Sequence, residues 1–394
     1  MVKTSEAVLF GHPDKVADQI SDAVLDKILS IDPKARVAVE TLVAGNNAIV
    51  AGELGTAAAN FNINIDEVVR QAIAGAGYTS SALGFDAFSC RILNLLHQQS
   101  SNLAQLQTLG PAVAGDQGIM FGYATVESPD NLPLQFSVAR QALFEINKLG
   151  LPDLHTDAKA LCSVQFPDND LPILKSLEIS IHTTRTDFRA VVKHVIRRLR
   201  ELYLGYLKIP ALFTVKFNPA GPFVFGGPAA DTGLTGRKIV VDQYGGEVPV
   251  GGGAFSGKDP SKVDRSAAYY ARYVALNLVR ANICSKALVS VSYMIGQDGP
   301  SSVTLNTFGT NHTSFSDAEV LAKCLKANVF DFRVEKIIEK LQLRNPIYEA
   351  TAHYGHFGIE PFANLVQTGD TYKAVTFFPW EKPDLITDIT TALS

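Results

Sequence analysis

Apolar residues recur at helical spacing in the first informative stretch of the chain. The repeat consists of Val16, Ile20, Val24 and Ile28 and predicts a helix that begins at Pro13, a residue suited to the first helical position. The acids of this helix fit an ordinary solvated face: Asp14, Asp18, Asp22 and Asp26. The same pattern brings His12, Asp14 and Lys15 together at the helix N-terminus, where an anion is favoured. A plain capped helix and an anion site both remain open at this point.

Two strand-like runs, 36–43 and 48–54, flank Gly45-Asn46-Asn47 and predict a hairpin. With a two-residue turn at Asn46-Asn47, Glu40 would lie directly opposite Glu53. Opposed like charges destabilise a sheet, so a nearby cation would be needed to stabilise this pair. A longer turn would shift the register and remove the argument, and two solvated glutamates are the alternative.

The rest of the chain mixes helical and strand-like periods. We expect helices at 65–74, 84–99, 188–207, 261–279, 316–328 and 333–341, and strands at 161–166, 174–182, 239–241 and 287–295. Residues 100–114 carry no charge and suit either a flap or a plain linker.

Length and composition limit the classes of protein that need to be considered. A chain of 394 residues predicts two or three domains, and 46% hydrophobic with 19% charged residues is typical of a packed globular protein. The net charge of −4 gives no basic field for nucleic acid. The four cysteines form no C-x-x-C pair, which fits free thiols in a reducing compartment. Without a signal-peptide pattern or an apolar run of roughly 18–20 residues, we expect a cytoplasmic protein with no membrane partner.

A glycine-rich loop at 251–260 carries the clearest chemical signal. Gly252, four residues, Gly257 and Lys258 nearly match the phosphate-binding P-loop, whose backbone N–H groups approach an anion. Asp259 stands where that pattern needs a hydroxyl for magnesium, so the loop indicates polyphosphate without indicating an ordinary P-loop NTPase. The plain alternative makes Asp259 a helix N-cap and Pro260 the first helical residue.

Other polar residues extend this signal. The cations are His12, Lys15, Lys159, Arg237, Lys238, Lys258 and Lys262, and the acids in turns or at helix starts are Asp14, Asp116, Asp231 and Asp264. Carboxylates beside a polyphosphate make sense as ligands of a divalent metal or as partners of a substrate ammonium. No activated nucleophile stands out, so we expect direct displacement between bound substrates, driven by positioning and electrostatics.

At these residues the chain resembles the S-adenosylmethionine synthetase (methionine adenosyltransferase) family over nearly its whole length. The family's patterns match at 11–15 (Gly-His-Pro-Asp-Lys), 17–23, 233–238, 251–259, 264–269 and 354–358. The resemblance implies transfer of the adenosyl group of ATP to the sulfur of L-methionine by attack at C5′. The triphosphate leaves and is then hydrolysed to pyrophosphate and phosphate.

The resemblance also implies roles for individual residues. His12 resembles the histidine beside the leaving triphosphate, and Lys159 a residue near the reacting centre. The phosphate clamp would comprise Lys15, Arg237, Lys238, Lys258 and Lys262, with Asp157 on the ribose and Phe223 on the adenine. Glu53, Gln99, Asp116 and Asp231 resemble the methionine contacts. Asp14 and Asp264 resemble ligands of Mg²⁺, two ions per site, and Glu40 the glutamate of a K⁺ site.

The family's fold is α/β, with three similar sheet-and-helix domains about a pseudo-threefold axis. Discontinuous domains are expected at 1–10 with 127–226, at 11–99 with 227–266, and at 106–126 with 267–394, and 100–114 would be a gating loop. The family's sites lie between the subunits of a homodimer, which usually pairs into a tetramer.

This sequence departs from the family pattern at five places. Phe10 replaces a glutamate, Val113 a glycine and Pro222 an arginine, and residues 359–378 are additional. The loop at 100–114 lacks the charges that are common in the family's gating loop. The cation and metal positions are retained, so we expect an active synthetase. The alternatives are a diverged enzyme that prefers a methionine analogue and a non-catalytic regulatory subunit.

Overall fold

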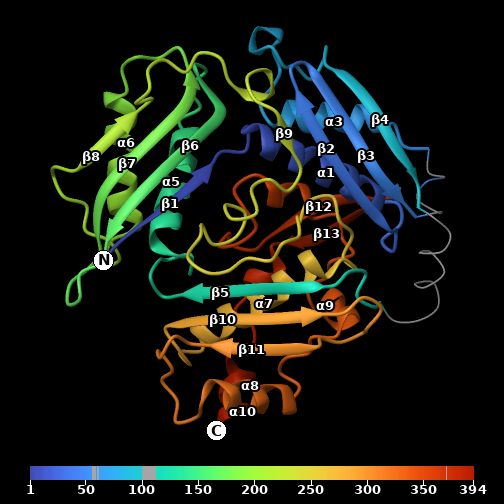
Figure 1. Cartoon of the computed structure of the whole chain (residues 1–394), viewed down its shortest axis with the longest axis vertical. Coiled ribbons are helices and arrows are strands. Elements are labelled where there is room, and N and C mark those ends of the chain that lie inside the picture. Colours follow the sequence, from blue (N-terminus) through green and yellow to red (C-terminus); the bar gives the residue numbers. More distant parts are fainter. Residues whose placement is uncertain (56–58, 60–61, 100–111, 370) are drawn as a thin grey trace.

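The structure is a computed structural model that describes the chain except for residues 56–58, 60–61, 100–111 and 370. Most of the expected gating loop therefore lies outside the described residues. Three helix-backed sheets surround a central region into which long loops run, as Figure 1 shows. The mixed α/β class expected from the sequence is confirmed.

The first sheet joins the N-terminus to the middle of the chain. Its strand order is β1 (Val2–Val8), β6 (Leu154–Gln165), β7 (Ile173–Thr183) and β8 (Thr214–Phe217). Helix α5 (Leu134–Asn147) contacts β1 and β6 and also packs on α6 (Arg189–Leu202).

The second sheet is the one that bears most directly on the site. Its order is β4 (Arg91–Gln98), β3 (Asn47–Leu54), β2 (Val37–Ala44) and the short β9 (Gly233–Leu234). Helix α1 (Pro13–Leu29) packs against β2 and β9, and α3 (Ile65–Gly75) packs against α1. The pairing of β9 with β2 brings residues near 233 beside the first fifty of the chain.

The third sheet has the order β11 (Ser302–Asn306), β10 (Lys286–Tyr293) and β5 (Gly118–Thr125), and α7 (Val263–Arg280) packs on β5 and β10. Helices α8 (Asp317–Lys326), α9 (Val334–Lys340) and α10 (Ile386–Leu393) complete this part of the fold. The segment 359–378, which the resemblance predicts to be additional, contains a separate hairpin of β12 (Phe362–Thr368) and β13 (Thr371–Phe377).

Short 3₁₀ turns connect these elements, and one of them leads towards β4. They are η1 (Ser81–Leu83), η2 (Gly227–Ala229), η3 (Glu349–Ala352) and η4 (Pro379–Glu381). The helix expected at 84–99 is wrong, because this stretch contains β4 instead. The strand adds in parallel to β3, so sheet pairing overrides the apparent helical period.

The hairpin of β2 and β3 forms in a different register from the one expected. Ala44 pairs with Asn47, so Gly45 and Asn46 make the turn, with Gly45 in the left-handed region at φ +56°. Glu40 therefore pairs with Ala51, and Glu53 pairs with Ala38. The two glutamates share a face as diagonal neighbours, and the expected direct opposition is wrong.

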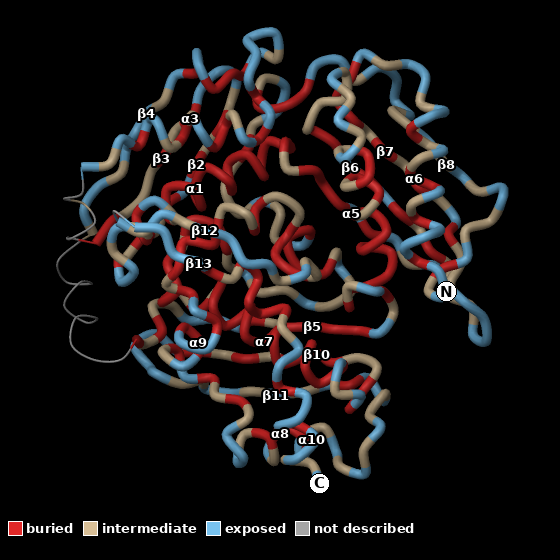
Figure 2. The backbone as a smooth tube through the Cα atoms, turned by 180° about the vertical axis from the view of Figure 1, so that it is seen from behind, coloured by how far each residue is buried: buried red, intermediate tan, exposed pale blue. Residues whose placement is uncertain are grey.

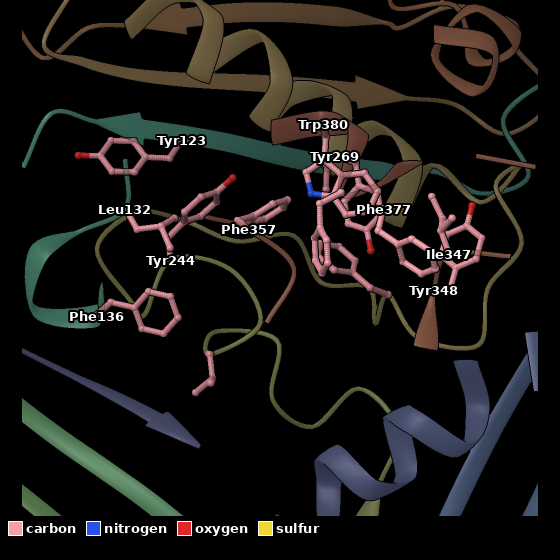
Figure 3. Packing of buried hydrophobic residues seen from close by; sticks show 14 of the residues in the cluster. Tyr123, Leu132, Phe136, Tyr244, Tyr269, Ile347, Tyr348, Phe357, Phe377 and Trp380 are labelled. Atoms are coloured by element: carbon pink, nitrogen blue, oxygen red, sulfur yellow. The ribbon is translucent and has the colours of Figure 1, made fainter. Parts of the chain in front are cut away.

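The core continues from the sheets into the centre of the molecule, where Figure 2 shows buried segments among loops of intermediate burial. Helix α7 is buried along most of its length, and Tyr269 on it stacks on Trp380 with ring centroids 3.7 Å apart. Figure 3 shows both side chains in the packed interior. Arg272 on the same helix forms a buried ion pair with Glu381 at 2.8 Å. The expected domain bounds stay a prediction, but each large sheet does join segments that are far apart in sequence.

Candidate active site

The acidic side of α1 is the scaffold of the site. Asp14 accepts the N–H of Leu234, Asp18 that of Gly236 and Asp22 that of Gly257, at 2.8–2.9 Å. Asp26 accepts the N–H groups of Tyr348 and Glu349. The first three acids are at most 2% exposed, so the interpretation of a solvated face is wrong. Spaced four residues apart, the acids instead satisfy buried backbone donors of several loops.

His12 begins this helix as its N-cap. Its Nδ1 accepts the N–H of Asp14 at 3.2 Å, and the ring is 5% exposed. Burial first, and then the charge of Lys238, lower the pKa of His12 to about 3. The imidazole is therefore neutral at physiological pH, and any role beside a polyphosphate is that of a hydrogen-bonding group rather than a cation.

The carboxylate of Asp14 lies close to two of the expected phosphate-binding cations. Lys238 donates to its carboxylate at 2.5 Å, and Arg237 Nε lies 3.8 Å away. Burial opposes ionisation, but the hydrogen bonds from Lys238 and from the N–H of Leu234 lower the pKa of Asp14. A carboxylate, two cations and a histidine thus meet at the start of α1.

The expected ribose and adenine residues lie on and beside the first sheet. Asp157 accepts the N–H of Gly227 at 2.8 Å, and burial raises the pKa of this carboxyl to about 6. Lys159 is exposed on β6 opposite Val8. The ring of Phe223 lies against His182, with centroids 5.7 Å apart. Asp231 is exposed, and its N–H is bound by the carbonyl of Gly227.

The glycine-rich loop reaches the other end of the site. Lys258 forms an ion pair with Asp264 at 2.6 Å, near the start of α7. A Cβ on Gly253 would come 2.2 Å from Cγ of Asp264, so only glycine allows this close approach. The loop therefore positions the lysine and leaves room for the acid.

Asp259 is not the N-cap of the following helix, which begins at Val263 after Lys262. Its buried carboxylate accepts from the N–H of Val37 at 2.9 Å and from Ser261, and it pairs with Lys262 and Arg36. Burial works against ionisation, but Lys262 and Arg36 lower the pKa of Asp259 to about 2. Asp259 thus ties the loop to β2.

Sequence reasoning missed the residue that anchors this loop, Arg265. All five of its N–H donors are used: two on Asp22, and one each on Phe255 O, Thr351 and Tyr269. The arginine follows Asp264 directly, which was the one available signal. This buried fork fixes α7 to α1 and so positions the two ends of the site.

Lys15 has a different place from the other expected clamp residues. Its ammonium is 1% exposed and binds Asp18 at 3.0 Å and Asp242 at 2.5 Å. These two carboxylates raise its pKa despite burial. The Lys15 ammonium is thus neutralised by carboxylates inside the fold.

The expected methionine contacts lie around the second sheet and β5. Glu53 is near the end of β3, and Gln99 follows β4 and donates its N–H to Leu54 O at 2.7 Å. The side-chain oxygen of Gln99 is buried and has no hydrogen-bond partner among the residues that the structure describes. Asp116 precedes β5, where Gly115 donates to Ser261 O. Glu40 is exposed on β2.

Two groups of acids and cations stand out among the expected site residues. One surrounds Asp14 and Lys238, and the other surrounds Asp264 and Lys258. Within the described ranges, no hydrogen bond or ion pair connects the first acid–lysine pair with the second. Both groups share one arrangement, in which a lysine neutralises a buried or half-buried carboxylate.

No cluster of three or more metal-ligating side chains occurs among the residues that the structure describes. Mg²⁺ is nevertheless compatible with Asp14 and Asp264, because it commonly takes one or two carboxylates and completes its shell with substrate phosphates and water. Phe10, where the resemblance predicts a glutamate, packs its ring on His353 and Tyr354 with centroids 5.6 and 5.8 Å away.

Comparisons with known proteins place the chain in context. Models for the N-terminal, central and C-terminal domains of S-adenosylmethionine synthetase match residues 1–101, 111–223 and 225–365. An S-adenosylmethionine synthase of Cytophaga hutchinsonii is 43% identical, with 97% of this chain and 96% of the relative covered. That of Azobacteroides pseudotrichonymphae is 41% identical, with 98% of both chains covered. None of the helices in the described part of the chain has the length and apolar character needed to span a bilayer.

Proposed function

This chain belongs to the S-adenosylmethionine synthetase family, and we propose that it makes S-adenosylmethionine by direct displacement between bound ATP and L-methionine. One observation in the structure carries the residue-level proposal. Two carboxylates suited to Mg²⁺ are each paired with a lysine suited to phosphate, Asp14 with Lys238 and Asp264 with Lys258. When a metal–polyphosphate complex binds, the metal can take the place of the lysine beside each carboxylate, and the phosphates can take the place of the carboxylate beside each lysine.

The reaction forms one bond and breaks one. The methionine sulfur attacks C5′ of ATP, the C5′–O bond breaks, and its electron pair leaves with the triphosphate. Arg237, Lys238, Lys258 and Lys262 stabilise the negative charge that develops on this leaving group. Neutral His12, buried at the start of α1, donates a hydrogen bond to it. Water then hydrolyses the triphosphate to pyrophosphate and phosphate.

The other residues hold the substrates in line. Asp157 binds the ribose hydroxyls, Phe223 stacks on adenine, and Lys159 lies near the reacting carbon. Glu53, Gln99, Asp116 and Asp231 bind the methionine end, where carboxylates neutralise its ammonium. Positioning of this kind lowers the barrier because it supplies the reacting geometry before the chemical step.

Two kinds of cation complete the proposal. Asp14 and Asp264 would hold two Mg²⁺ ions, which neutralise phosphate charge when bound. Glu40, exposed on the face that also carries Glu53, would contribute to a K⁺ site. Lys15 supports the site indirectly, since its charge holds Asp18 and Asp242.

We also propose a cytoplasmic homodimer that pairs into a tetramer. Among the described residues, no hydrogen bond or ion pair connects the Asp14–Lys238 pair with the Asp264–Lys258 pair of the same chain. This supports the dimer, because a second copy can bring its group at Asp264 to the group at Asp14. Exposed apolar side chains on β4 and β5 offer a surface for it: Leu93, Leu95 and Ile119 are 41–50% exposed. Light scattering during size-exclusion chromatography tests the oligomer.

The activity test is direct. Purified protein is incubated with ATP, L-methionine, Mg²⁺ and K⁺, and S-adenosylmethionine, pyrophosphate and phosphate are measured. Absence of all three products would refute the function and favour a non-catalytic subunit. A panel of methionine analogues follows, and a higher kcat/KM for an analogue would identify a diverged transferase.

A further inference from the structure

Tyr78 joins the segments that carry the proposed catalytic and nucleotide-binding residues. It follows α3, is 2% exposed, and donates its hydroxyl hydrogen bond to the carbonyl of Gly11, the residue before His12. Its hydroxyl also faces Gly227, where a Cβ would come within 2.4 Å of Oη. Gly227 in turn donates to Asp157. One phenol therefore contacts both the histidine segment and the ribose segment.

The position of this phenol is strongly determined. Its backbone N–H binds Ile73 O at 3.2 Å, and its carbonyl accepts the N–H of Ala87 at 3.0 Å. Its ring packs edge-on against Phe85, with centroids 5.4 Å apart. Burial first, and then the charge of Asp157, raise the pKa of Tyr78 well above its ordinary value, so the hydroxyl keeps its proton and remains a donor.

Gly11 is fixed from both sides. Its N–H donates to Thr156 O at 3.0 Å, and a Cβ there would come 2.1 Å from Oγ1 of Thr156. The Tyr78 hydroxyl is the hydrogen-bond partner of its buried carbonyl in the described part of the chain. Removing that hydroxyl would leave a buried carbonyl unpaired one residue before His12, and the backbone there would shift to find another partner.

We propose that Tyr78 is a positioning residue for the reaction, whose hydroxyl holds the Gly11 carbonyl so that His12 meets the leaving triphosphate in the correct place. The inference rests on the proposed function, because it gives His12 its role. It assigns to Tyr78 an effect on catalysis that acts through another residue, since its buried hydroxyl already has a partner inside the protein.

The test compares Tyr78→Phe with a matched control, Tyr293→Phe. Tyr293, at the end of β10 and opposite Gly118, is also 2% exposed and also donates to a backbone carbonyl, that of Phe332 at 2.7 Å. Phe332 lies between α8 and α9 and is not adjacent in sequence to any proposed site residue. Both variants lose one buried hydroxyl. We expect kcat to fall about tenfold for Tyr78→Phe, with KM values within about twofold, and kcat of Tyr293→Phe to stay unchanged.

A double-mutant cycle separates positioning from a general structural effect. In a His12→Ala background, Tyr78→Phe should change kcat less than about twofold, because its effect passes through the missing imidazole. Equal kcat for the two tyrosine variants, or an undiminished tenfold loss without His12, would overturn the inference. An inactive wild-type protein would instead refute the proposed function.

A donor-restoring variant covers the case in which Tyr78→Phe does not fold. p-Aminophenylalanine, introduced at position 78 by nonsense suppression, keeps the ring and an N–H donor. We expect this variant to fold and to retain kcat within about threefold of wild type. A folded variant with a kcat tenfold lower would contradict the role of the donated hydrogen bond.

Discussion

The ion pair of Lys258 and Asp264 leads to a prediction with two effects of opposite sign. Without ligands, Lys258 neutralises the carboxylate that we assign to Mg²⁺, at 2.6 Å. Lys258→Ala should therefore free Asp264 and strengthen binding of Mg²⁺ to the nucleotide-free protein. The same substitution should slow the reaction, because a cation that stabilises the leaving triphosphate is lost.

The structure sets the magnitudes. The side chains of Lys258 and Asp264 are 22% and 11% exposed, so the pair is partly screened, and an interaction of about 1 kcal/mol is reasonable at such a site. Loss of this competition should tighten Mg²⁺ binding about fivefold. Removal of a stabilising donor from the transition state typically lowers kcat by about 10²–10³.

Lys286→Ala is the matched control. Lys286 pairs with Glu127 at 2.5 Å, with side chains 28% and 14% exposed, but neither residue belongs to the proposed site. Mg²⁺ affinity is measured by isothermal titration calorimetry without nucleotide, and kcat by S-adenosylmethionine formation. We expect both quantities to change only in Lys258→Ala. Weaker Mg²⁺ binding in that variant would refute the competition between Lys258 and Mg²⁺ for Asp264. An unchanged kcat would refute the catalytic role of Lys258.

Three further predictions concern stability, pH and loop geometry. Arg265→Lys leaves three donors where five are used, so the free energy of unfolding in urea should fall by about 2–4 kcal/mol at equal protein concentration; a change below about 0.5 kcal/mol would contradict it. Burial raises the pKa of Asp157 from 3.8 to about 6, so its contribution to stability is fully present below pH 3.8 and is lost as pH rises through 6, by up to about 3 kcal/mol. Asp157→Asn should remove this pH dependence of stability, and parallel curves of unfolding free energy against pH for wild type and variant would refute this. In the wild type, kcat/KM for ATP should fall below pH 6. Gly253→Ala should displace Asp264 and lower kcat at least about tenfold, whereas Gly252→Ala, whose Cβ meets open space, should not; equal activities would contradict the close approach.

The comparison of the β2–β3 hairpin with its prediction shows where local reasoning fails. The alternation in 36–54 was sufficient to predict two strands and a turn. A turn placed one residue earlier shifted each cross-strand pair by two positions and separated Glu40 from direct contact with Glu53. Register depends on the turn conformation and on the burial of one face, which short-range patterns do not determine.

The helix at 84–99 failed for a related reason. Its apolar positions fit a helical period, but the parallel edge of β3 offered main-chain partners to residues 91–98. A prediction from local periodicity cannot include a partner strand supplied by another segment.

By itself, the sequence determined the helix that begins at Pro13, the glycine-rich loop with Lys258, and the set of cations and acids that indicated polyphosphate and its family. These features are local in the chain, or depend on residue types at fixed spacing. Only the tertiary structure decided how the site residues are used. It turned the acids of α1 inward onto loops, directed Lys15 to Asp18 and Asp242, and paired each proposed metal carboxylate with a lysine. The reason is that buried N–H groups and charges require partners, and many of those partners, such as Leu234 for Asp14 and Gly257 for Asp22, come from segments more than 200 residues away.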